Sequence, residues 1–345
     1  MQQHQMTAPG PLLDAAGRLT ETGYALSLIK EYARGAVKAS PLRIKEWDYY
    51  CIVSDRYALA LTVADNGYLY MDSVSLLDFD ERSQATWSSI LPPFGGRRLP
   101  ATSARGDISV SGKDYAISFE NDGKQRRLYG HVDRFPNGNG KPLLFDVTLT
   151  GAPRDSMVIA TPFAENPKAF YYNQKINCMR VSGSIKFKDR EYLCDPADTF
   201  AVLDWGRGVW TYDNTWYWGS ASGLADGVPF GFNIGYGFGD TSAASENVLF
   251  YGGKIHKLSQ VRFEIPVKDG REDYLSPWTF SSDDGRFELR FEPVMDRSAK
   301  IDALVICSDQ HQVFGKFSGT VILDDGRKLQ ISGLTGFAEK VRNKW

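Results

Sequence analysis

Short runs in which apolar and polar residues alternate, separated by turn-forming residues, recur along most of the chain. The clearest series consists of Trp47–Val53, Tyr57–Ala64 and Tyr68–Phe79, with a Ser-Asp-Arg turn after the first run and an Asp-Asn-Gly turn after the second. Alternation with a period of two places successive side chains on opposite faces of a strand, and such turns join antiparallel neighbours. The pattern predicts a three-stranded meander here and a protein built mainly of strands.

A further hairpin is predicted where Trp216–Ser220 and Val228–Phe238 flank a Leu-Ala-Asp-Gly turn. One face of the second run carries the large apolar residues Val228, Phe230, Phe232, Ile234, Tyr236 and Phe238. Its other face is mostly glycine, which permits close approach by a ligand, another sheet or a loop. No strand-to-helix transition follows these glycines, so they do not indicate a nucleotide-binding loop.

Four segments depart from the strand pattern. Met1–Pro11 is predicted to be a flexible tail, and Thr20–Val37 is predicted to be a helix because its apolar residues recur at helical spacing behind a capping threonine. Thr86–Ala104, which contains Pro-Pro and Gly-Gly pairs, is expected to be a loop across one end of a sheet. Ala160–Pro167 contains few strand formers and two prolines, so we expect a break between two halves there.

These features predict an all-β fold of two antiparallel β-barrel or sandwich domains, preceded by a short N-terminal helix. The expected divisions are residues 1–40 for the tail and helix, 41–165 for the first β domain and 166–345 for the second. A chain of 345 residues is long enough for two such cores without disulfides.

Composition and charge exclude several classes of function. The 40 Lys+Arg and 42 Asp+Glu residues give a net charge of -2, so nothing indicates binding to nucleic acid or to an anionic membrane surface. The four histidines are scattered and the four cysteines form no CxxC motif, so we expect free thiols and no metal or other cofactor. Because the chain has neither a secretory signal pattern nor an 18-residue apolar run, we expect a cytoplasmic protein without a transmembrane segment.

The most unusual chemistry lies in the stretch DWGRGVWTYDNTWYWGSASG, residues 204–223, which holds four of the eight tryptophans. Asp204 follows an apolar run, and Arg207 stands three residues further on. A carboxylate and a guanidinium among indole rings suggest a pocket for an apolar molecule. Asp204 and Arg207 are therefore our candidate catalytic residues. The candidate ligand-binding residues are Trp47, Trp205, Trp210, Trp216, Trp218 and Tyr236.

Two interpretations of Asp204 remain open at this point. Burial beside indoles would keep the carboxyl neutral and able to protonate a double bond, and aromatic faces would stabilise the resulting cation. A close Arg207 would instead hold Asp204 ionised, as a structural ion pair or as a base. The tryptophans have two interpretations as well, since indoles in antiparallel barrels also serve as core.

The remaining candidates carry weaker signals. Alternation directs Glu46 and Asp48 to one side of their strand, where they are either a functional pair facing inward or two solvated acids. Glu339 follows a glycine-containing turn, while His131 and His311 each stand alone in the sequence. No cysteine lies beside a histidine or a helix start, which argues against a thiol nucleophile.

Several motifs resemble known families. The runs LLDAAGRLTETGYA, KEWDYY and YALALTVADNGY, with the ending QVFGKFSGTVILDDGRKLQISGLTGFAE, resemble a bacterial domain-of-unknown-function family over nearly the whole chain. The segments YYNQKINCMRVSGSI, AVLDWGRG and WYWGSASGLADG are more distantly similar to the superfamily of carotenoid 1,2-hydratases and AttH-like proteins.

The second resemblance implies two lipocalin-like β-barrel domains and a site, within or between them, for a long apolar substrate. It also implies that Asp204, as the aspartate of a Leu-Asp pair, donates a proton to an isolated double bond. The Trp-x-Trp strand of the superfamily matches Trp216 and Trp218. This chain has Arg207 where the superfamily has a tryptophan, so the resemblance does not carry over the same hydratase reaction.

The hypothesis from the sequence is a protein that binds a hydrophobic small molecule, such as a lipid or isoprenoid, and performs cofactor-independent acid–base chemistry on it. Hydration, isomerisation and cyclisation are the reaction types considered. The alternative is a carrier that binds the molecule without reaction, and a structural role in the cell envelope is a third possibility.

Overall fold

The computed structural model of the chain describes residues 3–94, 96–303 and 306–344, and nearly all of its regular structure is β-strand. A first, 13-stranded sheet contains β2 (Gly23–Ala25), β4 (Ile44–Val53), β5 (Tyr57–Asp65), β6 (Tyr70–Asp78), β7 (Ser83–Leu91), β8 (Ile108–Gly112), β9 (Tyr115–Asn121), β10 (Arg126–Val132), β11 (Leu143–Thr150), β12 (Met157–Phe163), β13 (Asn166–Phe187), β14 (Arg190–Cys194) and β15 (Phe200–Val209). A second, nine-stranded sheet contains β16 (Asp213–Ala225), β17 (Val228–Tyr236), β18 (Val248–Tyr251), β19 (Lys254–Lys257), β20 (Val261–Glu264), β23 (Trp278–Ser282), β24 (Phe287–Ala303), β25 (Ile306–Ile322) and β26 (Lys328–Lys344). Two small ladders complete the fold, β1 (Gly10–Pro11) with β3 (Lys30–Glu31) and β21 (Val267–Lys268) with β22 (Arg271–Glu272).

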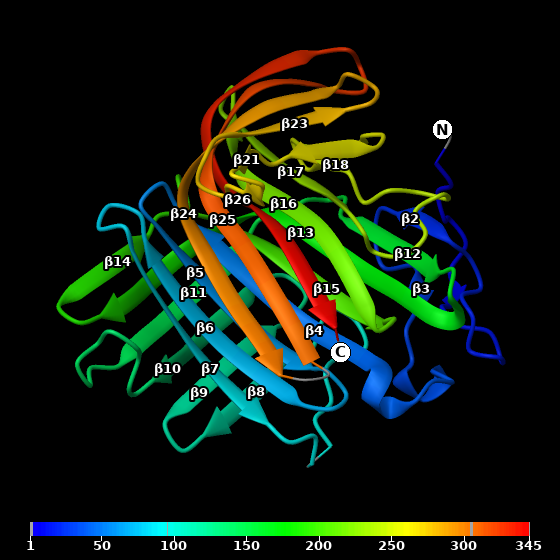
Figure 1. Cartoon of the computed structure of the whole chain (residues 1–345), viewed down its shortest axis with the longest axis horizontal. Helices are drawn as coiled ribbons and strands as arrows, with labels where there is room; N and C mark the ends of the chain where they lie inside the picture. Colours follow the sequence, from blue (N-terminus) through cyan, green and yellow to red (C-terminus); the bar gives the residue numbers. More distant parts are fainter. Residues whose placement is uncertain (1–2, 95, 304–305, 345) are drawn as a thin grey trace.

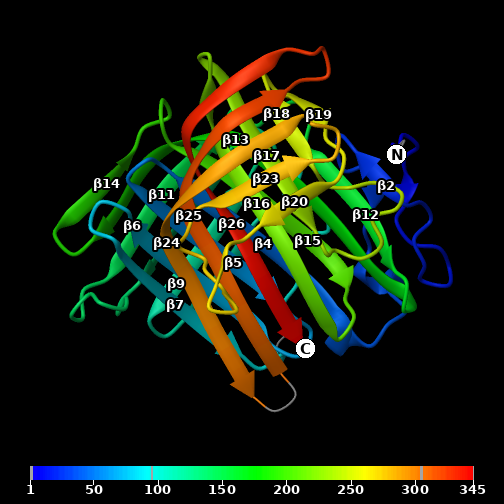
Figure 2. The same cartoon turned by 45° about the horizontal axis from the view of Figure 1, so that its top comes forward.

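Both large sheets are antiparallel and curl into half-barrels, which confirms the all-β prediction (Figures 1 and 2). The main path of the first sheet runs β7-β6-β5-β4-β15-β13-β11-β10-β9-β8, so β15 is central and pairs with β4 and β13. The curl brings the two ends of this path close together: the ring of Trp87 on the edge strand β7 lies 4.5 Å from that of Tyr115 on β9, the neighbour of the other edge strand, β8. The predicted Thr86–Ala104 loop is shorter than expected, because β7 continues to Leu91.

The second sheet runs β19-β18-β17-β16-β26-β25-β24-β23-β20, and its long strands β24, β25 and β26 cross in front of the first sheet in Figure 1. Contacts between β25 and the end of β6 support this packing, since the rings of Phe79 and Phe314 lie 5.8 Å apart. One apolar core fills the first half-barrel and reaches into the junction between the sheets. A separate core, rich in phenylalanine, fills the second half-barrel.

A β-bulge in β13 connects the two sheets. Asn177 is fully buried, and its Nδ2 donates to Ser220 Oγ at 2.8 Å and to the Phe232 carbonyl at 3.0 Å in the second sheet. The next residue, Cys178, has a φ of 61°, a left-handed conformation that costs a non-glycine residue free energy. Cβ on Gly231 would lie 2.8 Å from Cys178 Sγ, so the glycine-rich face of β17 permits the approach of another sheet.

The predicted N-terminal helix is wrong. Residues 20–37 contain the short strands β2 and β3 and one 3₁₀ turn, η1 (Arg34–Ala36), and a second such turn, η2 (Pro41–Arg43), follows. β2 pairs with β12, and Gly23 passes so close to the His4 carbonyl that a Cβ would lie 2.5 Å from the oxygen. Backbone pairing with the first sheet therefore overrides the helical spacing of the apolar residues. Within the predicted flexible tail, Met6 is buried and His4 N donates to the Ala243 carbonyl, so this part packs against the fold, while residues 1–2 lie outside the described residues.

The helical segments among the described residues are too short and polar to pass through a bilayer. The division of the chain at residue 165 stays a prediction. The sheets themselves change over between Val209 and Asp213, because β13 and β15 lie in the first sheet.

Candidate functional site

Asp204 and Arg207 lie on opposite faces of β15, so they do not pair with each other. They are three residues apart in a regular strand, and side chains three apart point in opposite directions. Arg207 is fully buried inside the first half-barrel, where its Nη2 lies 2.9 Å from Asp48 Oδ1. Asp204 faces the second sheet. The proposed Asp204–Arg207 ion pair is therefore absent, and the two candidates belong to different clusters.

Asp204 accepts two hydrogen bonds on one oxygen. Lys175 Nζ lies 2.8 Å from Asp204 Oδ1, and Asn173 Nδ2 donates to the same oxygen at 2.6 Å. Both partners come from β13, directly beside β15, and the Lys175 side chain is only 1% exposed. The ammonium also lies 4.0 Å from the centre of the Trp218 ring, which adds a cation–π contact. Asp204 is thus arranged as an acceptor, and its side chain keeps 11% of its exposure.

The second sheet contributes a buried glutamate to the same region. Trp218 Nε1 donates to Asn233 Oδ1 at 2.7 Å, and Asn233 Nδ2 donates to Glu246 Oε1 at 3.2 Å. The Tyr171 hydroxyl approaches the other carboxylate oxygen of Glu246 at 3.4 Å. Burial raises the pKa of Glu246, and the nearby negative charge of Asp204 raises it further, while Lys175 and Asn233 act in the opposite direction.

Glu339 on β26 is the third buried carboxyl group. Trp216 Nε1 donates to its Oε1 at 3.0 Å, and Gln312 Nε2 donates to its Oε2 at 2.9 Å. Gln312 in turn accepts from the Tyr49 hydroxyl of the first sheet at 3.3 Å. Burial raises the pKa of Glu339 to about 7, against the opposing effect of these donors and of nearby positive charges. Glu339 is therefore close to half-protonated at neutral pH.

These groups form what we call the inter-sheet polar cluster: Asn173, Lys175, Asp204, Asn233, Glu246 and Glu339. An aromatic group packs beside it through ring contacts of 5.0–6.4 Å: Trp47, Tyr171, Trp210, Trp216 and Phe238. Four of the predicted ligand-binding residues therefore meet at one place, namely Trp47, Trp210, Trp216 and Trp218.

The other two predicted ligand-binding residues lie elsewhere. Trp205 points into the first half-barrel, where its ring lies 5.7 Å from that of Tyr172. Tyr236 stacks on Tyr217 at 4.6 Å beside the core of the second half-barrel. Residues an odd number of positions apart in a strand face opposite sides. Trp205 is one residue from Asp204 on β15, and Tyr236 is three residues from Asn233 on β17, so both face away from the polar cluster.

Two adjoining cavities between the sheets lie in line with the cluster along four strands. The outer one has a volume of 250 Å³, and four neighbouring strands each contribute one side chain to its lining: Val53, Phe200, Ser222 and Thr335. Next comes a constriction of 10 Å³ lined by Cys51, Val202, Ser220 and Phe337. The third layer on the same four strands is Tyr49, Asp204, Trp218 and Glu339. Each layer is two residues further along its strand, a step of about 7 Å.

The weaker candidates have clear positions. Glu46 and Asp48 are both buried rather than solvated; Glu46 pairs with Arg34 at 2.6 Å and Asp48 with Arg207. His311 Nδ1 lies 2.7 Å from Asp296 Oδ2, and this hydrogen bond raises the pKa of His311. The half-buried His131 lies 3.6 Å from the carboxylate of Asp133. The four cysteines are free thiols, and burial raises the pKa of three of them: Cys51, Cys178 and Cys194.

Four members of the cluster were not predicted. Asn173 and Lys175 are two residues apart, so a strand places them on one face, but Gln174 between them is polar as well and the run shows no clear alternation that would single them out. Asn233 was noted only as part of a glycine-rich face. Glu246 follows β17 in a loop without periodicity, so the sequence offers no signal for it. Among the described residues no group of histidine, cysteine, aspartate or glutamate side chains has an arrangement suited to a metal ion.

The fold is similar to that of two solved structures. Kievitone hydratase from Nectria haematococca matches with a TM-score of 0.54 and 13% identity, over 92% of this chain and 96% of that one. An AttH candidate from Nitrosomonas europaea matches with a TM-score of 0.53 and 15% identity, over 91% of this chain and 96% of that one. At such identities the likeness shows the shared fold alone, which agrees with the resemblance to AttH-like proteins.

Among curated proteins, none matches the sequence. Residues 3–345 match the family described as a domain of unknown function (DUF2804), so the chain belongs to that family.

Proposed function

We propose that the protein binds a hydrophobic small molecule between its two sheets and performs acid–base chemistry on it without a cofactor. The observation that carries the proposal is the inter-sheet polar cluster, in which three carboxyl groups and one ammonium group are buried beside several indole rings. Burying ionisable groups costs free energy that well-packed apolar residues would not cost. Burial raises the pKa of both Glu246 and Glu339, and buried groups with shifted pKa values gather at functional sites.

The two best-placed carboxyl groups have complementary roles in this proposal. Glu339, with its pKa of about 7, is the proton donor, because a group that is half-neutral at the working pH donates efficiently. Asp204 is the base, since its Oδ1 is occupied by Lys175 and Asn173 and its Oδ2 is left for the substrate or a water. This assignment differs from the one that the resemblance implies, in which Asp204 is the donor.

Hydration illustrates the balance of the reaction. Glu339 would give its proton to one carbon of a double bond, the oxygen of a water would bond to the other carbon, and Asp204 would take the released proton of that water. Isomerisation uses the same two groups without water, with one proton added and another removed. The aromatic rings beside the cluster would stabilise positive charge on the intermediate. The hydratase named among the similar structures supports this choice by analogy of fold only.

The substrate class follows from the walls of the proposed route. The outer cavity has a mixed lining that includes Asp55, Asp198 and Gln330, whereas the constriction is lined mainly by apolar side chains, and tryptophans lie beyond it. A long apolar molecule such as a lipid or isoprenoid fits this sequence of layers better than a polar metabolite. The constriction is too narrow for such a molecule in this structure, so binding requires the sheets to separate slightly there.

The test begins with mass spectrometry of organic extracts from the purified protein. The identified molecule is then incubated with wild type, Glu339→Gln and Asp204→Asn. We expect both variants to bind the molecule but to convert it at least about 100-fold more slowly, the usual effect of removing a general acid or base. Asp146→Asn is the matched control, because it breaks an exposed aspartate–arginine pair of the same sheet at 2.7 Å. Equal turnover by all four proteins would remove both carboxyl groups from the mechanism.

A non-catalytic carrier is the second candidate function. Each carboxyl group of the cluster already has hydrogen-bond partners within the protein, an arrangement that also suits a static wall. A carrier would return the extracted molecule unchanged after prolonged incubation. The Glu339→Gln substitution would then change the affinity of the protein for the molecule, while the molecule itself would stay chemically unchanged.

A further inference from the structure

The first half-barrel contains a second polar cluster, on the face of β15 opposite to Asp204. Arg207 and Trp205 project into it from β15, Asp48 from β4 and Arg126 from β10. We propose that this interior is an anion-binding site that takes a carboxylate, and that residues 97–107 occupy it with their own carbonyl groups in this structure. The proposal is independent of the reaction proposed for the inter-sheet polar cluster.

Arg126 is the first observation. It is only 8% exposed, yet in the part of the chain that the structure describes it forms no ion pair with a carboxylate. Its Nη2 donates to the Ser103 carbonyl at 2.9 Å and its Nη1 approaches Met179 Sδ at 3.8 Å. The guanidinium also interacts with the Tyr50 hydroxyl, while its Nε has no acceptor. A buried guanidinium without a carboxylate partner is costly, because arginine keeps its charge in proteins.

Two more unused donors lie in the same interior. Trp205 Nε1 and Arg207 Nε are both buried and have no hydrogen-bond acceptor. The guanidinium carbon of Arg207 lies 4.3 Å from the centre of the Trp205 ring, so these donors are neighbours. Arg207 Nη2 lies 2.9 Å from Asp48 Oδ1; burial raises the pKa of Asp48, and the positive charges of Arg207 and Arg126 both act to lower it. Two guanidinium groups face one nearby carboxylate, and three N–H groups have no acceptor, so the charge and the donors of this interior suit a second anion.

The segment 97–107 currently fills the position that such an anion would take. The Pro100 carbonyl accepts from Arg207 Nη2 at 2.7 Å, and the Ser103 carbonyl accepts from Arg126 Nη2 and from Asn121 Nδ2 at 2.8 Å. Main-chain carbonyls thus meet both arginines in the way that carboxylate oxygens would, but without a negative charge. Ser103 is buried while both its neighbours are exposed, so the segment is inserted like a plug.

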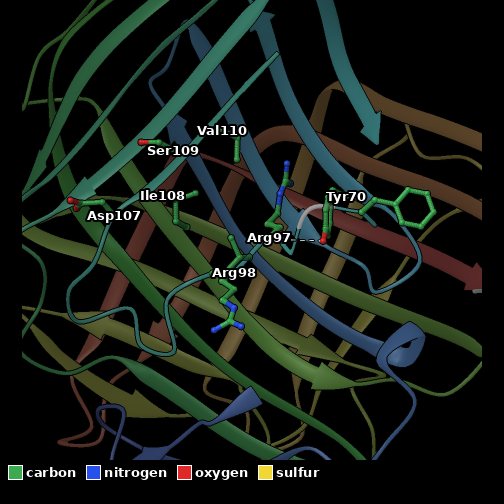
Figure 3. Close-up of a pocket in the computed structure, with 9 residues that line it drawn as sticks. Tyr70, Arg97, Arg98, Asp107, Ile108, Ser109 and Val110 are labelled. Carbon is green, nitrogen blue, oxygen red and sulfur yellow. Dashed lines mark hydrogen bonds between the residues drawn. The ribbon is translucent and has the colours of Figure 1, made fainter. Parts of the chain in front are cut away.

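An opening leads to this plug. A cavity of 410 Å³ lies between residues 97–99 and the start of β8, and Figure 3 shows Tyr70 and Arg97 on one side and Asp107 and Ser109 on the other. Arg97 is fixed by a bidentate pair with Asp72 at 2.6 and 2.9 Å, whereas Arg98 is exposed at the mouth. An exposed arginine there would attract an anion toward the opening.

Apolar side chains also lie next to the arginines, so a carboxylate with a hydrocarbon tail is the natural first probe. Leu128, two residues from Arg126 on the same face of β10, is fully buried, and Phe119 beside it contacts Tyr50 at 5.0 Å between ring centroids. Decanoate is therefore the first probe, with acetate and inorganic phosphate as comparison anions of different tail and geometry.

The experiment measures binding of these three anions by isothermal titration calorimetry at constant ionic strength. We expect decanoate to bind wild type, and Arg126→Met to bind it about 10- to 100-fold more weakly, as the loss of charged hydrogen bonds implies. Arg127→Met is the matched control, since Arg127 is the next residue on β10, points outward and pairs with Asp146. The affinity of Arg127→Met for decanoate should equal that of wild type. Arg126→Lys keeps the charge and serves if the methionine variant does not fold.

A second readout needs no variant. If an anion displaces the plug, amide hydrogen exchange within residues 97–107 should increase when decanoate is added to wild type, while exchange in β10 should not. Arg126-dependent binding of phosphate or acetate in place of decanoate would also support an anion site, without the hydrocarbon tail. Absence of binding by all three anions, or equal weakening in the Arg126 and Arg127 variants, would overturn the proposal and leave ordered water as the partner of these donors.

Discussion

Replacing Glu339 with glutamine should change how the stability of the protein depends on pH. The pKa of Glu339 is raised from the ordinary value of 4.5 to about 7 by burial. Between these values the folded protein holds a proton that the unfolded chain has released. The stabilisation is therefore complete below pH 4.5 and is lost as the pH rises through 7. Each pKa unit corresponds to about 1.4 kcal/mol, so roughly 2.5 kcal/mol should be lost between pH 5 and pH 8.

Glutamine keeps the size of the side chain and an acceptor for Trp216 Nε1, but it does not titrate. The measurement is urea unfolding of wild type and Glu339→Gln, followed by circular dichroism at pH 5, 6.5 and 8 and constant ionic strength. Other titrating groups contribute equally to both proteins, so the difference between them isolates Glu339. A difference that stays constant from pH 5 to 8 would refute the reasoning and would remove Glu339 as a neutral proton donor at neutral pH.

Three further predictions concern single contacts. Lys175→Met should lower the free energy of unfolding by about 3–5 kcal/mol, because it leaves the carboxylate of Asp204 buried without its partner, and adding Asp204→Asn should restore most of that loss. If the two changes are simply additive in urea unfolding, the ion pair is contradicted. Gly206→Ala should cost about 1–3 kcal/mol, because its Cβ would lie 2.1 Å from the Trp47 ring, whereas Gly35→Ala, with open space around its Cβ, should leave the midpoint of unfolding nearly unchanged. In NMR titration His311 should titrate above pH 6.5, because its hydrogen bond to Asp296 raises its pKa, and the stabilisation from this hydrogen bond should be lost as the pH rises through the raised pKa. An unchanged titration of His311 in Asp296→Asn would exclude this cause.

The strands were predictable because alternation survives in any strand with one dominant face. The meander of β4, β5 and β6 follows the predicted runs closely. The hairpin of β16 and β17 forms as predicted, but β16 is much longer than the predicted run Trp216–Ser220. The N-terminal segment was not predictable in this way, because its spacing fits a helix while its backbone pairs with β12, a partner more than a hundred residues away in the sequence.

The candidate site was predictable only in part. The separation of Asp204 from Arg207 follows from their spacing, since residues three apart in a strand face opposite sides, and the sequence alone contains that information. Which groups replace the missing partner depends on strand order: Lys175 reaches Asp204 because β13 lies beside β15, and no local pattern encodes that neighbour. Glu246 comes from a loop, so only the packing of the two sheets brings it to Asn233.

The central position of β15 has a consequence for folding kinetics. β15 must pair with β4, which precedes it by about 150 residues, and the neighbouring β16 must pair with β26, which follows it by about 120 residues. Contacts this distant in sequence form late and slowly, because the entropy of closing long loops is lost before any contact is gained. Asp204 and Glu339 acquire their environment only after both closures. A refolding experiment that follows turnover and strand content together should therefore show activity lagging behind the first appearance of β-structure.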